Sequence, residues 1–455
     1  MKQISVDFSK NIGPVKPMHS VNNGPAGSAV RKTGNFEAYR AARFPYARLH
    51  DASFCSSYGG EFSVDVHRIF RNFDADENDP ASYDFKATDA YVTRTEATGT
   101  HVFYRLGAAI EHEEKFGTYP PKDFMKWARI CEHIIRHYNE GWANGFSYGI
   151  EYWEIWNEPE CCNPDGTNPC WQGTNEQFVE FFCTVVPYLR GKFPSLKIGG
   201  PAFCSPDGAY YADGVPKEDN LQHMLLSEMQ KRGITMDFYS YHCYTSEPEN
   251  LLTYIKNGER ILEKYGFAGM ETILNEWNYN CGWLAENFTN GIETILGLKG
   301  ASYAAACMSL AQASSLGMLM YYDARPSAYN GLFKPYTLKI NYTFYPFKMF
   351  GDLAALGKAA TVEGLEKGLY AVAATDGKKH ALMLTRYLDA GVEGENAEPI
   401  EISLGLEKGK KYAAKAYVIN EKNQPLEIEA SLCECGKLSL SCPMYSIAFV
   451  EIEEI

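Results

Sequence analysis

The sequence predicts an α/β fold: a (β/α)8 TIM barrel with an appended C-terminal antiparallel β-sandwich. Eight short apolar runs alternate with helical patterns up to about residue 323. After residue 358, short runs of alternating polar and apolar residues follow one another instead. The length of 455 residues exceeds one ordinary core and suits a barrel of about 250 to 350 residues plus a smaller domain.

The eight barrel strands are predicted from short apolar, aromatic-rich runs bounded by turn signals. Consecutive runs are separated by enough chain for a helix, so neighbouring strands are expected to be parallel. The predicted strands are 15–22, 46–51, 101–107, 152–158, 197–202, 237–244, 271–277 and 317–323.

Helical patterns occupy the intervals between these strands. Pro120 and Pro121 precede a run with apolar residues on one face, which Gly141 stops. Further helices are predicted over 174–193, 219–232 and 250–265. The Ala-rich segment 294–316 is predicted as one helix whose small side chains let it pack closely on the sheet.

The domain boundaries follow from the change of pattern. The barrel is predicted over residues 10–357, with its last helix over about 344–356. The N-terminal segment 1–9 is assigned with 358–455 to the β-sandwich, because it would otherwise be an unpaired edge strand. Strands of the sandwich are predicted at 369–373, 380–384, 412–419, 426–430 and 445–452.

Charge and composition exclude several classes of function. A net charge of −14 repels phosphate backbones, so nucleic acid is not an expected partner. The sequence contains no apolar stretch of the roughly 20 residues that span a bilayer, so no membrane role is expected. The N-terminus lacks a secretory apolar region, and 13 scattered cysteines suit a reducing compartment, so a cytoplasmic location is predicted.

Two Asn-Glu pairs are the strongest functional signal. Glu158 follows Asn157 at the end of the fourth run, and Glu276 follows Asn275 in the seventh. A lone glutamate at a strand end is more often an ion-pair partner or a helix cap. Two of them at the carboxyl ends of barrel strands provide the acid and the nucleophile or base that glycosidic bond cleavage needs. The aromatic neighbours of both pairs suit stacking on a sugar ring.

These residues resemble glycoside hydrolase family 39, the β-xylosidase and α-L-iduronidase family within a clan of retaining enzymes. The string Trp-Glu-Ile-Trp-Asn-Glu-Pro at 153–159 carries the likeness, supported by His19 and Asn22-Asn23 on the first strand and Arg48-Leu49-His50 on the second. The resemblance extends over the whole chain, including the appended sandwich. It implies a retaining glycosidase, and no cofactor is expected.

The resemblance also implies roles for individual residues. Glu158 matches the general acid/base, and Glu276 matches the nucleophile that forms a covalent glycosyl-enzyme. Asn157 is expected to bond the sugar 2-hydroxyl. His242 and Tyr244 match a His-x-Tyr motif in which the Tyr supports the nucleophile, and Arg48 matches a strand-two arginine that lowers the pKa of the nucleophile.

The physical chemistry of the two steps agrees with these roles. A neighbouring arginine and a tyrosine hydroxyl favour the charged form of a nucleophile, whereas burial among tryptophans favours the protonated form of an acid. A retaining enzyme requires the two carboxyl groups to lie about 5 to 5.5 Å apart, and a separation beyond roughly 6.5 Å would indicate inversion.

Several further residues are predicted to contact the substrate. His19 and His50 are expected at strand ends, Trp171 and Trp277 border the two glutamate motifs, and Tyr322 ends the eighth strand. For some of the candidate site residues, a purely structural role stays open as an alternative. His242 could be a core histidine, Arg48 could pair with Asp51 at the surface, and Tyr322 could pack under the sandwich.

The chain departs from the family pattern beside both glutamates. The insertion 161–170 follows the first, and Asn and Trp flank the second where other residues are usual. Transfer of xylosidase specificity is therefore open, and arabinose, galactose or glucose are alternatives. The groups Cys161, Cys162, Cys170 and Cys433, Cys435, Cys442 lack the Cys-x-x-Cys pairs of structural zinc sites, so no metal is predicted.

Two functions of other classes are alternatives to hydrolysis. A catalytically silent carbohydrate-binding barrel would not need both glutamates and their supporting residues. An aldolase would need a Schiff-base lysine at a strand end, and none of the eight runs ends in Lys. The long loops after strands one, two and four favour a closed pocket and exo action on a short oligosaccharide or glycoside. A homo-oligomer is compatible with the sequence.

Overall fold

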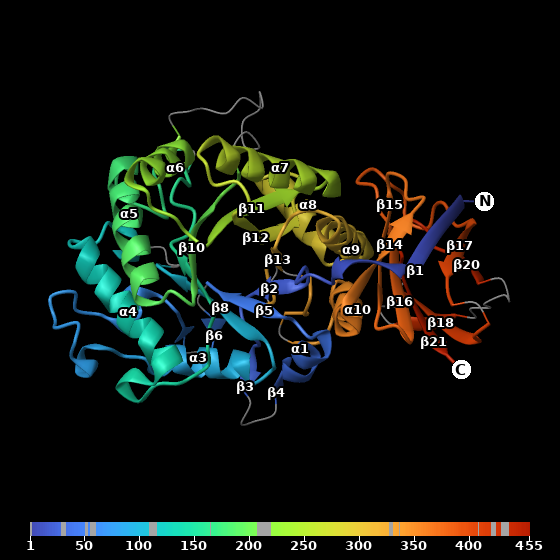
Figure 1. The fold of residues 1–455 in the computed structure, drawn as a ribbon, viewed down its shortest axis with the longest axis horizontal. Helices are drawn as coiled ribbons and strands as arrows, with labels where there is room; N and C mark the ends of the chain where they lie inside the picture. Colours follow the sequence, from blue (N-terminus) through green and yellow to red (C-terminus); the bar gives the residue numbers. More distant parts are fainter. Residues whose placement is uncertain are drawn as a thin grey trace.

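The computed structural model describes residues 2–28, 33–50, 53–54, 61–108, 116–163, 165–206, 220–326, 331–335, 337–407, 409–419, 425–428 and 436–455. A barrel surrounded by helices and a β-domain lie side by side, and both ends of the chain lie in the β-domain (Figure 1). None of the helices in these ranges has the length and apolar character needed to cross a bilayer.

The barrel is a closed sheet of eight strands in the order β10-β11-β12-β13-β2-β5-β8-β9. Every neighbouring pair is parallel, as the interposed helices require. Each of the eight predicted runs overlaps one strand, so the predicted barrel is confirmed. The strands are β2 (Ser20–Asn22), β5 (Tyr46–Leu49), β8 (His101–Leu106), β9 (Tyr152–Ile155), β10 (Lys197–Phe203), β11 (Phe238–Thr245), β12 (Glu271–Tyr279) and β13 (Met318–Tyr321).

Alternation along each strand divides its side chains between the barrel interior and the surrounding helices. On β11, Phe238 belongs to a small apolar cluster at the floor of the interior, with side chains from β8, β9, β12 and β13. Ser240, His242 and Tyr244 follow at every second position above it, and Tyr239 and Tyr241 belong to the larger outer core. The barrel interior therefore becomes polar toward the carboxyl ends of the strands.

Helices cover the outside of the barrel, and their apolar faces fill the core cluster. One prediction about them is wrong. The Ala-rich segment 294–316 is not one helix, because α8 stops at Ile295 and Gly297 adopts an extended conformation as the N-cap of α9. The helices are α1 (Phe36–Ala42), α2 (Val66–Ile69), α3 (Lys86–Glu96), α4 (Phe124–Glu140), α5 (Asn175–Lys192), α6 (Leu221–Arg232), α7 (Pro248–Lys264), α8 (Ala285–Ile295), α9 (Leu298–Gln312) and α10 (Phe344–Leu356).

The β-domain is a sheet of nine strands in the order β19-β18-β21-β16-β15-β14-β1-β17-β20. Apolar residues from strands distant in this order share one core, so the sheet folds over into the sandwich that the sequence predicts. Three of the strands, β14, β17 and β20, were not predicted. The strands are β1 (Lys2–Pro14), β14 (Lys358–Glu363), β15 (Leu369–Thr375), β16 (Lys379–Arg386), β17 (Pro399–Gly405), β18 (Tyr412–Ile419), β19 (Pro425–Ile428), β20 (Lys437–Ser441) and β21 (Ile447–Glu454).

The N-terminal segment pairs with this sheet over a longer stretch than the sequence suggests. β1 extends to Pro14, past the predicted boundary at residue 9, and lies antiparallel to β14 and parallel to β17. β14 begins at Lys358, where the sequence places the second domain. The chain thus contributes a strand to the β-domain before it enters the barrel at β2.

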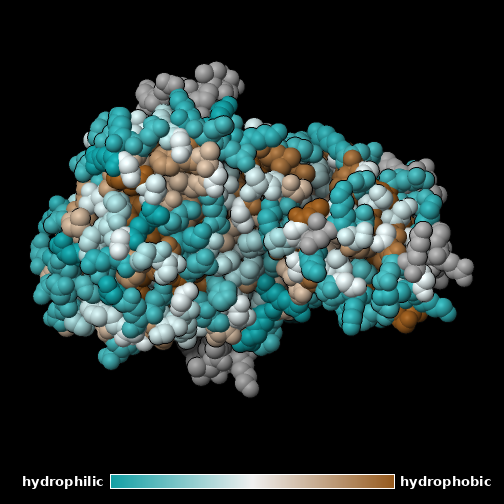
Figure 2. Space-filling model, in the orientation of Figure 1, coloured by the Kyte–Doolittle hydropathy of each residue, from teal (hydrophilic) through white to brown (hydrophobic). Residues whose placement is uncertain are grey.

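The two domains share a packed interface. Tyr370, Val372 and Met383, on β15 and β16, belong to the same apolar cluster as α9 and α10, whereas Leu382 and Leu384 face the core of the sandwich. One face of these strands packs against the barrel helices and the other against the core of the sandwich. This shared packing fixes the β-domain on the barrel. The face of the molecule in Figure 2 is mainly hydrophilic, with apolar residues in small separate patches.

Candidate active site

A β-bulge in β12 sets the direction of the second Asn-Glu pair. The pairing of β11 with β12 runs from Tyr241 opposite Leu274 directly to His242 opposite Glu276, so Asn275 is the extra residue. A bulge turns side chains that would otherwise alternate. Both Asn275 and Glu276 consequently reach the barrel interior, where Asn275 donates to Glu154 at 2.5 Å and Glu276 meets Arg48.

The first Asn-Glu pair lies just beyond β9, which ends at Ile155. Trp156 and Glu158 adopt left-handed backbone conformations, with φ of 76° and 44°. Such values are costly for residues with side chains and persist where neighbours fix them. Here the backbone N–H of Trp156 donates to Leu106 and that of Glu158 donates to Ala202, so both adjacent strands hold the segment.

Arg48, fully buried on β5, connects the two Asn-Glu pairs. Its Nε donates to Oε2 of Glu154 at 2.6 Å, and its Nη2 donates to Oδ1 of Asn157 at 2.6 Å. Its Nη1 donates to Oε1 of Glu276 at 2.7 Å and to Asn22 at 3.1 Å. The planar guanidinium fork can address all of these oxygens at once. The alternative that Arg48 forms a surface pair is incompatible with its burial; Asp51 lies outside the described residues.

Glu276 is held from two sides within 3 Å. Oε1 accepts from Arg48, and Oε2 accepts from the Tyr244 hydroxyl at 2.8 Å. His50 is a third neighbour of this carboxylate, with its Nε2 3.4 Å from Oε1 of Glu276. A positive charge and a hydroxyl donor both favour an ionised carboxylate.

Glu158 and Glu276 converge on His242. One carboxylate oxygen of each and a ring nitrogen of His242 all lie within 4.8 Å of one another. The Nδ1 of His242 is 2.8 Å from Glu158 Oε1 and 3.6 Å from Glu276 Oε2. Glu158 is partly exposed, whereas the Glu276 side chain is 7% exposed. The two acids therefore face each other across one small space.

His242 is held neutral by its surroundings. Burial lowers its pKa from 6.5 to about 4, against the opposing attraction of Glu276. Its Nε2, and the Nδ2 of Asn157, are buried and have no hydrogen-bond partner among the described residues. Buried polar atoms without partners are unusual, and at this position they are available to a polar ligand.

Buried charged residues next to the site hold His50 and Arg48 in place, and they were not identified from the sequence. Arg105 Nη2 donates to Asp65 at 2.7 Å and also contacts the carbonyl of His50, while its Nε lies 3.3 Å from His50 Nδ1. Glu154, which also accepts from Ser240 at 2.6 Å, was missed as well. The sequence did carry a signal for both residues, because alternate side chains of a strand point to the same face. On this basis Glu154 on β9 and Arg105 on β8 could have been assigned to the barrel interior.

Three of the predicted substrate contacts lie away from the site. His19 precedes β2, at the opposite rim of the barrel, where its Nε2 contacts the Arg43 carbonyl and its ring packs near Phe350. Trp277 faces outward and packs against Tyr321, because it follows the inward Glu276. Trp171 is 1% exposed and packs against Phe178 and Phe181 of α5. The positions of these three residues give no support to their prediction as sugar contacts, because proximity in sequence does not fix the direction of a side chain.

Aromatic side chains other than these border the site. Tyr322 lies 6.4 Å from Tyr244 between ring centroids, and its hydroxyl accepts from Arg325. Trp283, which was not predicted, packs edge-on to Tyr244 at 5.4 Å and is 63% exposed. An exposed indole beside the residue that holds Glu276 offers a face for stacking.

Comparisons with known proteins agree with the fold and the motif. Residues 48–274 match the model of glycosyl hydrolases family 39. The chain is 24% identical over 252 residues to a β-xylosidase of Geobacillus stearothermophilus, a match that covers 48% of this chain and 45% of that relative. The match thus spans less than half the length of the relative.

Solved structures resemble the chain over its full length. A glucosidase from Croceicoccus marinus has a TM-score of 0.78 at 19% identity, covering 100% of this chain and 99% of its own. A monomeric β-xylosidase from Caulobacter crescentus has a TM-score of 0.67 at 14% identity, covering 100% and 99%. A family 51 α-L-arabinofuranosidase from Thermotoga petrophila has a TM-score of 0.68 at 14% identity, covering both chains completely. At these identities the likeness concerns the fold.

Proposed function

Because residues 48–274 belong to glycosyl hydrolases family 39, we propose that this chain is a retaining glycoside hydrolase acting through a covalent glycosyl-enzyme. Glu276 is the nucleophile and Glu158 the general acid/base. The observation that carries the proposal is the approach of the two carboxylates to within 4.8 Å around His242. Such closeness suits a nucleophile and an acid acting on one sugar, and it supports the spacing of a retaining enzyme over the wider spacing of an inverting one.

In the first step, Glu276 attacks the anomeric carbon while Glu158 protonates the departing oxygen. Arg48 and Tyr244 favour the charged carboxylate that this attack requires. As Glu276 loses its charge in forming the glycosyl ester, Arg48 remains paired with Glu154 at 2.6 Å. The buried guanidinium thus keeps a carboxylate partner throughout the step.

In the second step, Glu158, now ionised, removes a proton from water, which attacks the anomeric carbon and releases Glu276. Neutral His242 contacts Glu158 through Nδ1 at 2.8 Å and can donate to its ionised form or accept from its protonated form. The free Nδ2 of Asn157 is the donor placed for a sugar hydroxyl beside the nucleophile.

The preferred substrate is a β-xyloside or a short β-linked oligosaccharide cleaved from its end. The β-xylosidase relative supports this choice. Arabinosides, galactosides and glucosides are the alternatives, because the insertion 161–170 borders the site and could change its specificity. Cys161 of the insertion lies beside Glu158, and the Cys170 carbonyl accepts from Trp156 Nε1 at 2.9 Å. The ten cysteines in the described ranges are all free thiols, which supports the proposed cytoplasmic location.

A panel of p-nitrophenyl glycosides tests the activity, and NMR of the first product tests retention. We expect hydrolysis of at least one β-glycoside with the β-anomer released first. Release of the α-anomer from that substrate would contradict the double displacement. A wild-type protein that binds xylose or xylobiose without hydrolysing any glycoside would instead identify a carbohydrate-binding barrel. Products of random length from a xylan chain would contradict exo action.

A further inference from the structure

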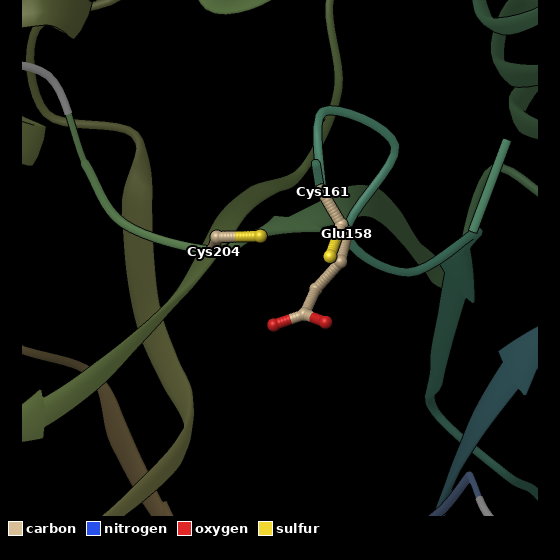
Figure 3. A group of neighbouring side chains, drawn as sticks. All are labelled: Glu158, Cys161 and Cys204. Atoms are coloured by element: carbon tan, nitrogen blue, oxygen red, sulfur yellow. The ribbon is translucent and has the colours of Figure 1, made fainter. Parts of the chain in front are cut away.

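Two loops bring a pair of thiols against Glu158. Cys161 follows β9 within the insertion, and Cys204 follows β10, 43 residues further along the chain. One carboxylate oxygen of Glu158 and the sulfurs of Cys161 and Cys204 all lie within 4.8 Å of one another. Figure 3 shows the Cys204 side chain pointing toward the other two residues.

A third thiol supports this arrangement. The side chains of Cys170 and Cys204 each share a hydrogen bond with that of Cys161. Cys170 is buried, and its carbonyl is fixed by Trp156. The sulfur of Cys161 therefore lies between a second cysteine of the insertion, Cys170, and Cys204 from the neighbouring loop.

A cavity borders the two thiols, and a neighbouring carboxylate fixes one of their loops. A cavity of about 480 Å³ is lined by Cys161, Cys204 and Glu160, among other residues. Glu160 Oε1 accepts from the Cys204 backbone N–H at 2.7 Å, which fixes that loop. The Oε2 of Glu160 is buried and has no hydrogen-bond partner among the described residues.

We propose that Cys161, Cys204 and Glu158 form a binding site for a thiophilic divalent cation of the zinc type, and that the bound ion inhibits the enzyme. Two thiolates and a carboxylate are ligands that zinc takes, and a three-ligand set leaves a position for water. Inhibition rests on the proposed function, because an ion bound to Glu158 removes the general acid/base from the reaction.

Cobalt titration of the full-length protein tests the site without any assay of activity. After chelator treatment under reducing conditions, we expect Co²⁺ to produce a sulfur-to-metal charge-transfer band that saturates at one ion per chain. Cys161→Ser and Cys204→Ser should each weaken this binding by about tenfold or more. Cys162→Ser is the matched control, because Cys162 neighbours Cys161 but is exposed and contacts the carbonyl of Asn163.

The results separate the site from the proposed function. No charge-transfer band in the wild type, or equal loss in Cys162→Ser and Cys204→Ser, would overturn the site. Thermal unfolding without metal shows whether each serine variant is folded. If an active substrate is found, Zn²⁺ should inhibit the wild type and inhibit Cys204→Ser far less; equal inhibition of both would overturn the inhibitory role. If no glycoside is cleaved, the cobalt result still decides whether the ion binds.

Discussion

Arg48 donates to Glu276 at 2.7 Å although 228 residues separate them in sequence, and the same guanidinium donates to Glu154 at 2.6 Å. The side chains of Arg48 and Glu154 are 0% exposed, and that of Glu276 is 7% exposed. One buried cation thus compensates two buried carboxylates. Removal of the cation leaves both carboxylates buried without the positive charge that compensates them.

Arg48→Met should therefore lower the free energy of unfolding by about 3 to 5 kcal/mol, measured by urea denaturation at neutral pH. Arg48→Lys is the matched control. Lysine keeps the positive charge but lacks the several fixed N–H donors of the guanidinium group. We therefore expect a smaller loss of stability together with a large loss of turnover. A methionine variant as stable as the wild type would show that Arg48 does not carry this compensation.

Glu158→Gln should reduce turnover by an amount that depends on how much protonation the leaving group needs. With an alkyl glycoside, which needs protonation, kcat/KM should fall by about 10²- to 10⁴-fold. With a dinitrophenyl glycoside, the first step needs little acid help, so glycosylation should be much less affected. Glu151→Gln, at the exposed residue before β9 on the opposite rim, is the control and should hydrolyse both substrates normally. Equal losses on the two substrates would argue against an acid role for Glu158.

His242 should make the fold sensitive to acid. Burial lowers its pKa from 6.5 to about 4, so between these values the unfolded chain binds a proton that the folded chain does not. The free energy of unfolding should consequently fall as pH decreases from 6.5 to 4. The contribution of this one group reaches about 3 kcal/mol at most and is absent above pH 6.5.

Urea unfolding at several pH values checks this expectation. His242→Gln should reduce the pH slope between 6.5 and 4 relative to the wild type. His19→Gln should do the same, because burial also lowers the pKa of His19 to about 4. His101, whose side chain is 69% exposed, supplies the control variant His101→Gln, for which we expect the wild-type slope. An unchanged slope in His242→Gln would contradict the assigned burial effect.

Trp283→Ala should weaken binding without disturbing the reacting groups. Loss of a stacking face worth about 0.5 to 1.5 kcal/mol corresponds to a rise in KM of roughly two- to tenfold for an aryl glycoside or a disaccharide. We expect kcat to stay within about twofold, since Trp283 touches Tyr244 at the ring edge and no catalytic carboxylate. Steady-state kinetics on both substrates measures the two parameters.

Trp277→Phe is the contrasting substitution. Trp277 is fully buried between barrel and helices, so the variant should lower the free energy of unfolding by about 1 to 3 kcal/mol and leave KM unchanged. Leu284→Ala, at the exposed neighbour of Trp283, should change neither property. A rise in KM for Trp277→Phe but not for Trp283→Ala would reverse the assignment of the two indoles.

The sequence by itself determined the barrel, its eight strand positions and the two glutamates. This was possible because burial imposes apolar runs on parallel strands, and because the carboxyl ends of such strands meet at one face of a barrel. Glu158 and Glu276 could therefore be placed together without any coordinates. Helix α10 was predicted with its observed bounds because burial in the main core makes most of its residues apolar.

The tertiary structure alone decided which side chains enter the site. The bulge at Asn275 directs Glu276 inward and Trp277 outward, and the left-handed residues Trp156 and Glu158 aim the first motif; neither feature follows from alternation. The meeting of Cys161 with Cys204 likewise depends on how two loops close over the barrel. Side-chain direction at irregular backbone and contact between distant loops are set by packing of the whole chain, and local sequence carries little signal for either.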